Sequence, residues 1–352
     1  MIKSILSEKS SKELIKLAKK LVPPLSPNFY KGQAGRIVVV GGCEDYTGAP
    51  FFSAHSSAQF GADMVHIICE KEAAQVIKTY SPNLMVHPYL REHREDIIKL
   101  AQFAGDYNSV KNNGQVDELT DEELIDRYLM PKINSLLDRV HVVIVGPGFG
   151  RNKIMLKICE RIILRVRELK KPLIVDADAL YLVSLKPELI KGYERGILTP
   201  NLPEFKRLIK SLNIDSSKIQ EDQLASELSS KLNGVVIFQK GKNDVITNGK
   251  DVLISDTIGS YKRCGGQGDT MTGIIGTILC WGEAYKQNLW KHDRDIKDDW
   301  IPLLSCFGGS VATRIAQRKA FKKMGRSMQA SDLHDFVGES YNYVFESDEF
   351  NG

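Results

Sequence analysis

The chain has 352 residues and nearly balanced charge, with 48 Lys and Arg against 44 Asp and Glu and a formal net charge of +4. Without a basic tract interleaved with aromatic residues, this balance argues against nucleic acid as a partner. No apolar run approaches the roughly 18 residues that a membrane span requires. The six cysteines form no C-x-x-C pair, which predicts free thiols in a reducing compartment and favours the cytoplasm.

The order of apolar runs predicts one amphipathic helix followed by alternating strands and helices. Leu14, Ile15, Leu17 and Leu21 share a helical face that ends before Pro23. Continuous apolar runs further along predict buried strands at 36–40, 64–69, 84–88, 140–145, 172–178, 197–199 and 234–239. Helices are predicted at 51–61, 70–80, 120–137 (opened by a capping box), 153–169, from 200 onward, at 303–324 and at 331–343.

Two segments depart from this simple alternation, and one buried residue needs its own interpretation. The residues 244–247 and 252–255 predict an antiparallel hairpin around Asn248 and Gly249. His66, inside a buried strand, is interpreted as a core histidine. The polar segment 91–139 is predicted to be a surface elaboration without core residues, with a flexible loop at 105–114. We therefore predict a single domain over 1–352.

Strands that alternate with helices predict an α/β fold with three layers, α/β/α, around a mostly parallel central sheet. In such folds ligands bind beyond the carboxyl ends of the strands. The unusual loops of this chain all follow predicted strands; they lie at 41–42, 146–150, 176–178, 199–204 and 240–241. We expect them to form one shared site.

The most informative stretch is the glycine-rich turn of Gly265, Gly266 and Gly268, which leads into an apolar helix beside Asp269. Glycines let a ligand approach the main chain closely. The first turn of a helix presents unpaired N–H groups and the positive end of the dipole, so the turn is typical of a phosphate site. Asp269 is the one group there that could take a proton, and its place at a helix start favours the ionised carboxylate. The alternative is that Asp269 is only an N-cap.

Other motifs carry weaker signals. Gly146-x-Gly148-x-Gly150 follows a strand but lacks the spacing of a dinucleotide-binding fingerprint. Asn201 and Glu204 could orient a hydrated divalent metal or could simply cap a helix. Asp176 and Asp178 could likewise be functional acids or turn residues, and the cation of Lys240 could lie against phosphates.

Taken together, these residues resemble the ribokinase-like superfamily and, within it, the ATP-dependent NAD(P)H-hydrate dehydratases. The resemblance covers residues from about 31 to about 338. It rests on Lys31-Gly-x-x-Gly-Arg36, Gly41-Gly42, Tyr46-Thr-Gly-Ala-Pro50, Tyr80-Ser-Pro82, Gly146-Pro-Gly148, Asp176-Ala-Asp178, Leu198-Thr-Pro-Asn201 with Glu204, Gln239-Lys-Gly241 and Arg263-Cys-Gly-Gly-Gln-Gly-Asp269. Cys43 stands where the family usually has Ser, and Phe149 where it usually has Leu.

The resemblance implies a repair reaction in which ATP, with Mg²⁺, drives the dehydration of hydrated NADH or NADPH. It implies that Asp269 is the catalytic base and that Mg²⁺ accompanies ATP; the turn at Asn201 and Glu204 leaves open whether Glu204 also holds this metal through water. The hydrate-binding residues that it implies are Gly148, Asn201, Leu202, Pro203, Glu204, Phe205, Lys206, Arg207 and Asp269. The ATP-binding residues are Lys240, Gly241, Lys242, Asn243, Asp244, Gly259, Ser260, Tyr261, Lys262, Arg263, Cys264, Gly265, Gly266, Gln267 and Gly268.

Two other functions remain open from the sequence. A vitamin or sugar kinase would share the fold and the Gly-x-Gly-Asp chemistry, but Tyr46 to Pro50 resembles the hydrate family instead. A non-catalytic nucleotide-binding protein would not need an intact Asp269. The partners expected are small molecules, namely NADH hydrate, NADPH hydrate and ATP, without nucleic acid or membrane. The sequence leaves open whether the chain forms a homo-oligomer.

Overall fold

The computed structural model of the chain describes residues 6–103, 116, 118–347 and 350. A single nine-stranded sheet runs in the order β3-β2-β1-β4-β5-β6-β7-β8-β9. The strands are β1 (Arg36–Val40), β2 (Met64–Glu70), β3 (Met85–Leu90), β4 (Val142–Val145), β5 (Leu173–Val175), β6 (Gly196–Leu198), β7 (Val236–Gln239), β8 (Asp244–Thr247) and β9 (Val252–Ser255). Neighbours from β3 to β7 pair in parallel, whereas β7, β8 and β9 pair antiparallel.

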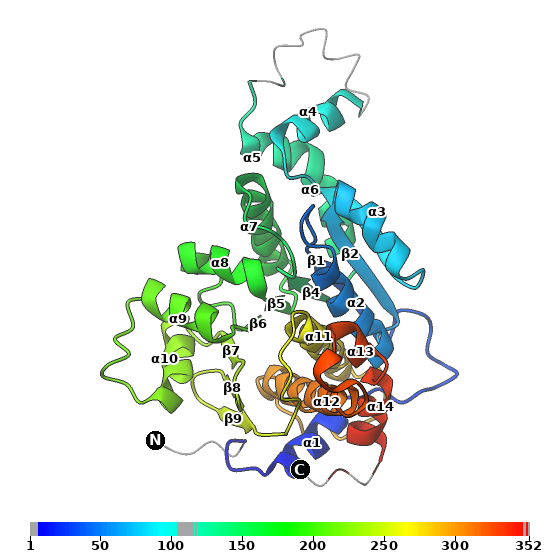
Figure 1. Cartoon of the computed structure of the whole chain (residues 1–352), viewed down its shortest axis with the longest axis vertical. Coiled ribbons are helices and arrows are strands. Elements are labelled where there is room, and N and C mark those ends of the chain that lie inside the picture. Colours follow the sequence, from blue (N-terminus) through cyan, green and yellow to red (C-terminus); the bar gives the residue numbers. More distant parts are fainter. Residues whose placement is uncertain (1–5, 104–115, 117, 348–349, 351–352) are drawn as a thin grey trace.

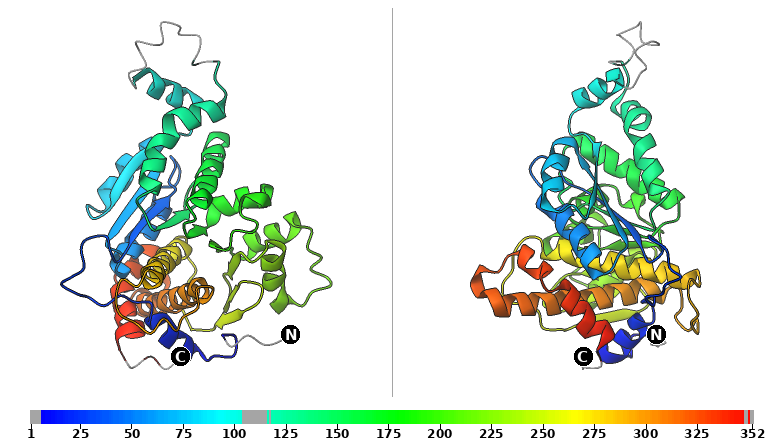
Figure 2. Two further views of the ribbon diagram at one scale, coloured as in Figure 1. Left: turned by 180° about the vertical axis from the view of Figure 1, so that it is seen from behind. Right: turned by 90° about the vertical axis from the view of Figure 1, so that its right-hand side faces the viewer.

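Helices cover both faces of the sheet (Figures 1 and 2). One face carries α1 (Ser11–Lys19), α2 (Gly48–Phe60), α3 (Lys71–Tyr80), α11 (Gln267–Lys286), α12 (Trp300–Met324) and α14 (Val337–Tyr341). The other carries α4 (Arg94–Phe103), α5 (Asp121–Leu124), α6 (Met130–Leu137), α7 (Lys153–Glu168), α8 (Ala177–Leu185), α9 (Leu202–Ser211) and α10 (Leu224–Lys231). The predicted three-layer fold with a mostly parallel sheet is confirmed.

The two-residue period of the strands divides the interior into two cores. In β1, Ile37 and Val39 pack into the core under α2 and α11, whereas Val38 and Val40 pack into the core under α7. Both side-chain sets are fully buried, which explains why β1 reads as a continuous apolar run. His66 is also buried, and its Nδ1 lies 3.0 Å from Nε2 of His87, so its interpretation as a core histidine is confirmed.

Helix α11 is packed at very short range between α2 and α12, and α11 and α12 lie side by side in both views of Figure 2. A Cβ added at Gly273 would lie 2.0 Å from the carbonyl oxygen of Ser53, and one at Gly309 would lie 2.4 Å from Ile275. Ser57 Oγ donates to the carbonyl of Gly273 at 3.0 Å. Small residues therefore let these helices approach almost backbone to backbone.

Three predictions about elements need correction. The segment 91–139 does not lack core residues, because Ile97, Leu124, Ile125, Ile133 and Leu137 are fully buried. Their apolar spacing along α4 to α6 is hidden in a highly charged sequence, whose charged side chains occupy the outer surface. The flexible loop predicted at 105–114 lies outside the described residues.

The other two corrections concern boundaries. The strand predicted at 172–178 ends at Val175, because Asp176 is already the N-cap of α8. The helix predicted at 331–343 is divided into α13 (Ala330–His334) and α14. Leu333 packs in a small cluster with Ala320 and Met328, whereas Val337 packs in the larger core, so the chain turns between them. Among the described residues, no helix is long and apolar enough to cross a membrane.

Candidate active site

Two cavities adjoin at the carboxyl edge of the parallel strands, and Asp269 and Ala177 line both of them. The first has a volume of about 640 Å³ and is lined by Asp176, Ala177, Asn201, Glu204, Lys240, Gly241, Lys242, Asp244, Arg263, Cys264, Gly265, Gly266, Gln267, Gly268, Asp269, Met271, Ser310, Thr313, Arg314 and Gln317. The second has a volume of about 680 Å³ and is lined by Cys43, Asp45, Tyr46, Ala49, Glu92, Gly148, Gly150, Arg151, Asn152, Ala177, Asp178 and Asp269.

The glycine-rich loop brings the amino end of α11 to the first cavity. Gly266 is the N-cap of α11 and has a φ of 96°, in the left-handed region that favours glycine. Asp269 is the third residue of the helix, and no side-chain capping hydrogen bond is formed at this end. The interpretation of Asp269 as an N-cap is therefore wrong. Asp269 instead lines both cavities.

A lysine and a buried aspartate face each other across the same cavity. Lys240, which follows β7, places Nζ 2.8 Å from Oδ1 of Asp176. That oxygen also accepts a hydrogen bond from the Thr199 hydroxyl at 2.8 Å. A Cβ built on Gly268 would lie 3.3 Å from the Lys240 amine, so the cation lies directly against the glycine-rich loop. Although burial lowers it, the pKa of Lys240 is raised overall by the carboxylates of Asp176 and Glu204.

The protonation state of Asp269 differs from the sequence-based expectation. Burial first and the nearby charge of Asp176 second raise the pKa of Asp269 to about 7, while Lys240 and its own backbone N–H act in the opposite direction. The position at a helix start was expected to favour the ionised carboxylate. The stabilisation by the N–H groups of the first turn is smaller than the cost of desolvation and of the charge on a second buried acid. Near neutrality Asp269 therefore exists in both forms, which suits a general base.

We expect catalytic efficiency to depend on this ionisation. Because the base form is the unprotonated carboxylate, kcat/KM should rise with pH and level off above a midpoint near the Asp269 pKa of about 7. The pKa of Asp269 in the folded protein lies above the value of 3.8 usual for an aspartate, so the folded state holds a proton that the unfolded chain releases. The contribution of this group to stability should therefore decline as pH rises from about 4 to about 7. Initial rates from pH 5 to 9 provide the measurement, and a profile flat across pH 7 would contradict the assignment.

The loops around the first cavity are tied together by one buried ion pair. Arg314 of α12 donates from Nη2 to Oδ1 of Asp244 at 2.7 Å and from Nε to Oδ2 at 2.9 Å. The same guanidinium donates to the carbonyls of Gly241, Lys242 and Thr257. Asp244 in turn accepts a hydrogen bond from the Gly241 N–H at 3.0 Å. This pair therefore fixes the turn that carries Lys240.

The second cavity is built around three glycines that follow β4. Gly146 has a φ of 120°, and a Cβ there would lie 1.8 Å from the carbonyl oxygen of Asp176, so only glycine permits this close approach. The N–H of Gly150 donates to Oδ2 of Asp178 at 3.0 Å, and Arg151 donates to its Oδ1 at 2.9 Å. Asp178 thus holds this turn against the start of α8.

Ala177, between the two acids, adopts a strained conformation. Its φ is 47°, in the left-handed region that costs a residue with a Cβ about 1–3 kcal/mol. Ala177 lines both cavities, so the strain lies where the two cavities meet. Backbone strain of this kind is concentrated at functional sites, because the surrounding structure must hold it in place.

The turn at Asn201 and Glu204 forms a helix cap. Asn201 Oδ1 accepts from the Glu204 N–H at 3.0 Å, and Glu204 accepts from the Asn201 N–H at 2.9 Å, which completes a capping box at α9. Both residues also line the first cavity. Burial raises the pKa of Glu204, and Lys240 lowers it. The capping interpretation is confirmed, and it leaves the second carboxylate oxygen of Glu204 for another partner.

Several predicted site residues do not line either cavity. In the hydrate set these are Leu202, Pro203, Phe205, Lys206 and Arg207, and in the ATP set they are Asn243, Gly259, Ser260, Tyr261 and Lys262. Phe205 is 3% exposed and belongs to the core under α8 and α9, because it occupies the inner face of an amphipathic helix. Ser260 and Gln267 each donate to the carbonyl of Lys262, so this part of the loop is stabilised by its own contacts.

Sequence reasoning also missed residues that the structure brings to the site. Thr313, Arg314 and Gln317 come from α12, more than forty residues beyond Asp269. Nothing in the local pattern of α12 marks them, because they continue the face of an ordinary buried helix. Arg151 was also missed, although its position just after the Gly146 to Gly150 turn was a usable signal.

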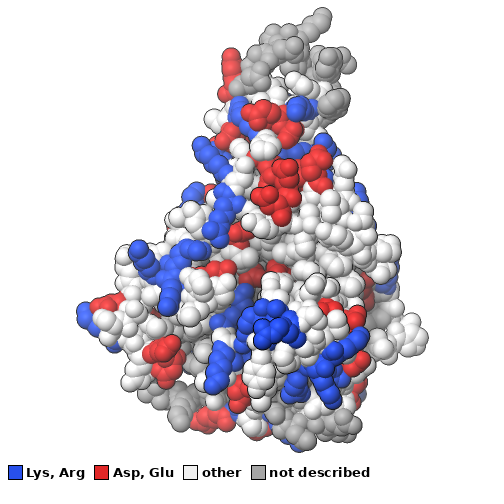
Figure 3. Space-filling view, viewed as in Figure 1, with Lys and Arg blue, Asp and Glu red and all other residues white. Residues whose placement is uncertain are grey.

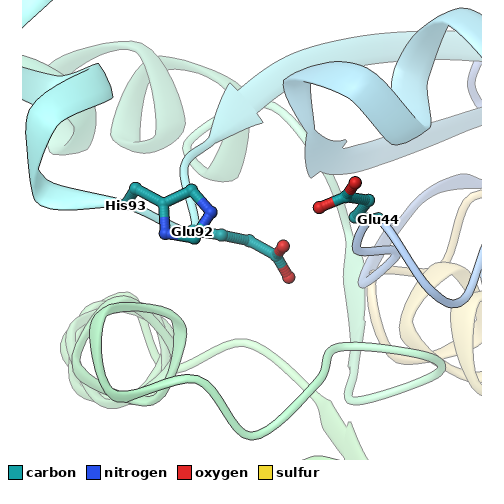
Figure 4. Close-up of side chains that lie close together, drawn as sticks. All are labelled: Glu44, Glu92 and His93. Atoms are coloured by element: carbon teal, nitrogen blue, oxygen red, sulfur yellow. The ribbon is translucent and has the colours of Figure 1, made fainter.

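Charge is unevenly distributed around the site. On the face shown in Figure 3, Lys and Arg gather around the glycine-rich loop and over α12 and α13, while Asp and Glu gather over α4 to α6. Glu92 lines the second cavity, and Glu44, Glu92 and His93 bring one ligand atom each within 4.8 Å of one another (Figure 4). Burial and the neighbouring Glu70 raise the pKa of Glu92. The basic face adjoins the first cavity, which suits a polyanion there.

Comparison with known proteins identifies the family. Residues 37–337 match the model of the NAD(P)H-hydrate dehydratase family. The chain belongs to this family. It is 45% identical to the ATP-dependent (S)-NAD(P)H-hydrate dehydratase of Candida albicans, with 97% of each chain covered. It is 43% identical to the protein of the same name from Saccharomyces cerevisiae, with 97% of this chain and 100% of the relative covered.

Solved structures agree on the fold. A ribokinase-like superfamily protein of Enterococcus faecalis matches with a TM-score of 0.67 at 17% identity over 96% of both chains. The ADP/ATP-dependent NAD(P)H-hydrate dehydratase of Bacillus subtilis, co-crystallised with ATP and Mg²⁺, matches with a TM-score of 0.60 at 18% identity, covering 94% of this chain and 97% of that one. The ribokinase-like fold expected from the resemblance is confirmed.

Proposed function

We propose that this chain uses ATP to dehydrate the S form of NADH hydrate and NADPH hydrate, regenerating NADH or NADPH with release of ADP and phosphate. The proposal draws its substrates from the names of relatives that match nearly its whole length. The observation that carries it is the position of Asp269, which borders both cavities. One carboxylate can therefore act on a hydroxyl in one cavity while a phosphoryl donor lies in the other.

The chemistry follows from the weakness of hydroxide as a leaving group. Asp269 takes the proton from the hydrate hydroxyl as that oxygen attacks the γ-phosphorus of ATP. The hydroxyl becomes a phosphate ester as ADP leaves. The lone pair of the ring nitrogen then expels phosphate, and loss of a proton from the adjacent carbon restores the double bond. Phosphoryl transfer mostly requires positioning and charge stabilisation. Lys240, held 2.8 Å from Asp176, and the N–H groups of the glycine-rich loop supply these.

We assign ATP to the first cavity and the hydrate to the second. Ten of the fifteen ATP residues expected from the resemblance line the first cavity, among them Lys240, Gly265 and Gly268. The expected hydrate residue Gly148 lines the second, together with Tyr46. Asn201 and Glu204 line the first cavity, so they would lie nearer the phosphates than the nicotinamide. We place the reaction in the cytoplasm, where its six free thiols would stay reduced.

The carboxylates of this site fit a magnesium ion. Asp176 and Glu204 offer carboxylate oxygens beside Lys240, and a hard divalent ion prefers oxygen ligands of this kind. Glu204 would hold it through water. When bound with ATP, Mg²⁺ neutralises charge on the phosphate oxygens. Asp176 and Lys240 meanwhile keep their ion pair and orient the loop turn beside it.

The decisive test is incubation of the protein with hydrated NADH, Mg²⁺ and ATP. We expect reduced-nicotinamide absorbance to recover and one phosphate to appear for each NADH formed, with no recovery when ATP is omitted. A small-molecule kinase would instead consume ATP and leave a stable phosphorylated product. Absence of NADH recovery, with ATP consumed, would therefore favour the kinase alternative.

The position of ATP can be tested at Gly265. A Cβ added there meets nothing within 4 Å, so Gly265→Asp should fold and place a negative charge in the loop. We expect the Kd for ATP to rise about tenfold or more through like-charge repulsion. Isothermal titration measures it, with Gly338→Asp as a control at another open position. Unchanged affinity would place ATP elsewhere.

Gly266 is unsuitable for the same test, although its place in the loop suggests a Val substitution. A Cβ at Gly266 would lie 2.5 Å from Ala330 and 2.7 Å from Phe52, so a larger residue would displace α13 or α2 as well as any phosphate. Loss of binding in such a variant would not separate the two effects.

A further inference from the structure

A third cavity lies at the opposite, amino edge of the sheet, remote from Asp269. Its volume is about 360 Å³, and it lies where β1, β4, β5 and β6 begin. Five cationic residues line it, namely Arg36, Arg139, Lys170, Lys171 and Arg195, against two acids, Asp138 and Glu283. Of these residues, the sequence analysis named only Arg36, as the last residue of the Lys31-Gly-x-x-Gly-Arg36 motif, and the proposed reaction uses none of them.

Both acids of this cavity already have cationic partners. Asp138 Oδ1 pairs with Arg165 at 2.9 Å, outside the cavity lining. Glu283 pairs with Arg195 at 2.5 Å and with Lys286 at 3.1 Å. In the part of the chain that the structure describes, no carboxylate lies within ion-pair distance of Arg36, Arg139, Lys170 or Lys171. The cavity therefore has an excess of positive charge.

Helix ends account for only part of this excess. Lys171 Nζ donates to the carbonyls of Leu137, Asp138 and Val140, so its charge is used at the carboxyl end of α6. Arg139 donates one hydrogen bond from Nε, to the carbonyl of Ser135. Lys170 and Arg139 are exposed and line the cavity. Helix capping therefore leaves hydrogen-bond donors of Lys170, Arg139 and Arg36 for another partner.

Arg36 and His141 form the inner wall. Arg36 Nη2 lies 2.9 Å from Nε2 of His141, and burial first and the charge of Arg36 second lower the pKa of His141 to about 4. The imidazole is thus a neutral acceptor near pH 7 and leaves the charge of Arg36 uncompensated. Two guanidinium groups and an ammonium around one cavity match the oxygens of a phosphate, which Arg can bind in bidentate fashion.

We propose that this cavity is a second anion site that binds a small phosphate-bearing molecule. The volume suits orthophosphate or a small phosphate monoester rather than a dinucleotide. The cations on Arg36, Arg139 and Lys170 provide the binding, and Lys171 fixes the turn between α6 and β4 that forms its wall. This site does not depend on the function proposed for Asp269.

Equilibrium dialysis with labelled orthophosphate at constant ionic strength tests the proposal. Arg139→Gln/Lys170→Gln removes two exposed cations, so folding should be retained, and we expect affinity at this site to fall about tenfold or more. The matched control is Lys218→Gln/Lys231→Gln, which removes two exposed charges elsewhere. Arg36→Gln should also weaken binding.

Orthophosphate could also bind in the first cavity, beside the glycine-rich loop. The Lys240→Gln variant distinguishes binding there from binding at the amino-edge site. If the amino-edge site exists, the Lys240→Gln protein should still bind one phosphate there. The Arg139→Gln/Lys170→Gln protein should lose that phosphate. The proposal is overturned if wild type binds no phosphate, or if Lys240→Gln abolishes all binding while the double variant retains it.

Discussion

Asp269→Asn should lower kcat by about 10²- to 10⁴-fold, the usual loss for a general base. The amide keeps the size of the side chain but cannot accept the hydroxyl proton. Affinity for ATP should change little, because the loop N–H groups and Lys240 remain. Single-turnover rates with hydrated NADH and titration with ATP separate these two quantities. The pH dependence attributed to Asp269 should disappear with it.

The same variant also provides a test of the fold. Since burial raises the pKa of Asp269 to about 7, its ionised form carries a desolvation cost above that pH. A neutral amide avoids this cost, so thermal unfolding at pH 8 should occur at or above the wild-type temperature. Asp215→Asn, an exposed acid that lines neither cavity, is the control. A folded Asp269→Asn protein with full turnover would refute the assignment.

Arg314→Met should destabilise the chain by about 3–5 kcal/mol, because it leaves the carboxylate of Asp244 buried without its partner. Arg314 and Asp244 are 7% and 5% exposed, and the guanidinium makes both hydrogen bonds of the bidentate pair. The turn at Gly241 and Lys242 loses its carbonyl contacts as well, so ATP affinity should fall with stability. Denaturant unfolding and ATP titration give the two measurements.

Two companion variants make this result specific. Arg318→Met removes an exposed arginine one turn further along α12 and should have little effect. Arg314→Met/Asp244→Asn removes the unpaired charge and should recover part of the lost stability. If Arg314→Met alone unfolds like wild type, the ion pair does not hold the loops together.

The parts of the site that could be predicted from sequence are those where backbone chemistry restricts residue choice. The apolar run of β1 and the hairpin of β8 and β9 around Asn248 and Gly249 were predicted to the residue, because burial on both faces and a tight turn each allow few sequences. The glycine-rich loop and Asp269 were found for the same reason. Each of these signals lies within a few consecutive residues.

What could not be predicted depends on contacts between distant segments. Nothing near Arg314 shows that it pairs with Asp244, seventy positions earlier. The raised pKa of Asp269 depends on Asp176 and on burial, neither of which can be read from the residues around the helix start. The buried positions of α4 to α6 were missed because charged neighbours dominate the composition of that segment.

The close packing of α11 limits how the enzyme can move during turnover. A helix whose Gly273 lies against the Ser53 carbonyl, and whose Ile275 lies against Gly309, has no room to slide or to rotate about its axis. Asp269 therefore keeps its position while substrates enter and products leave. Closure over the reactants, which commonly takes microseconds to milliseconds in enzymes, must come from the loops that surround this helix. If Asp269 is the base that we propose, its carboxylate stays in place during turnover, and we expect any movement to occur in the loops around it.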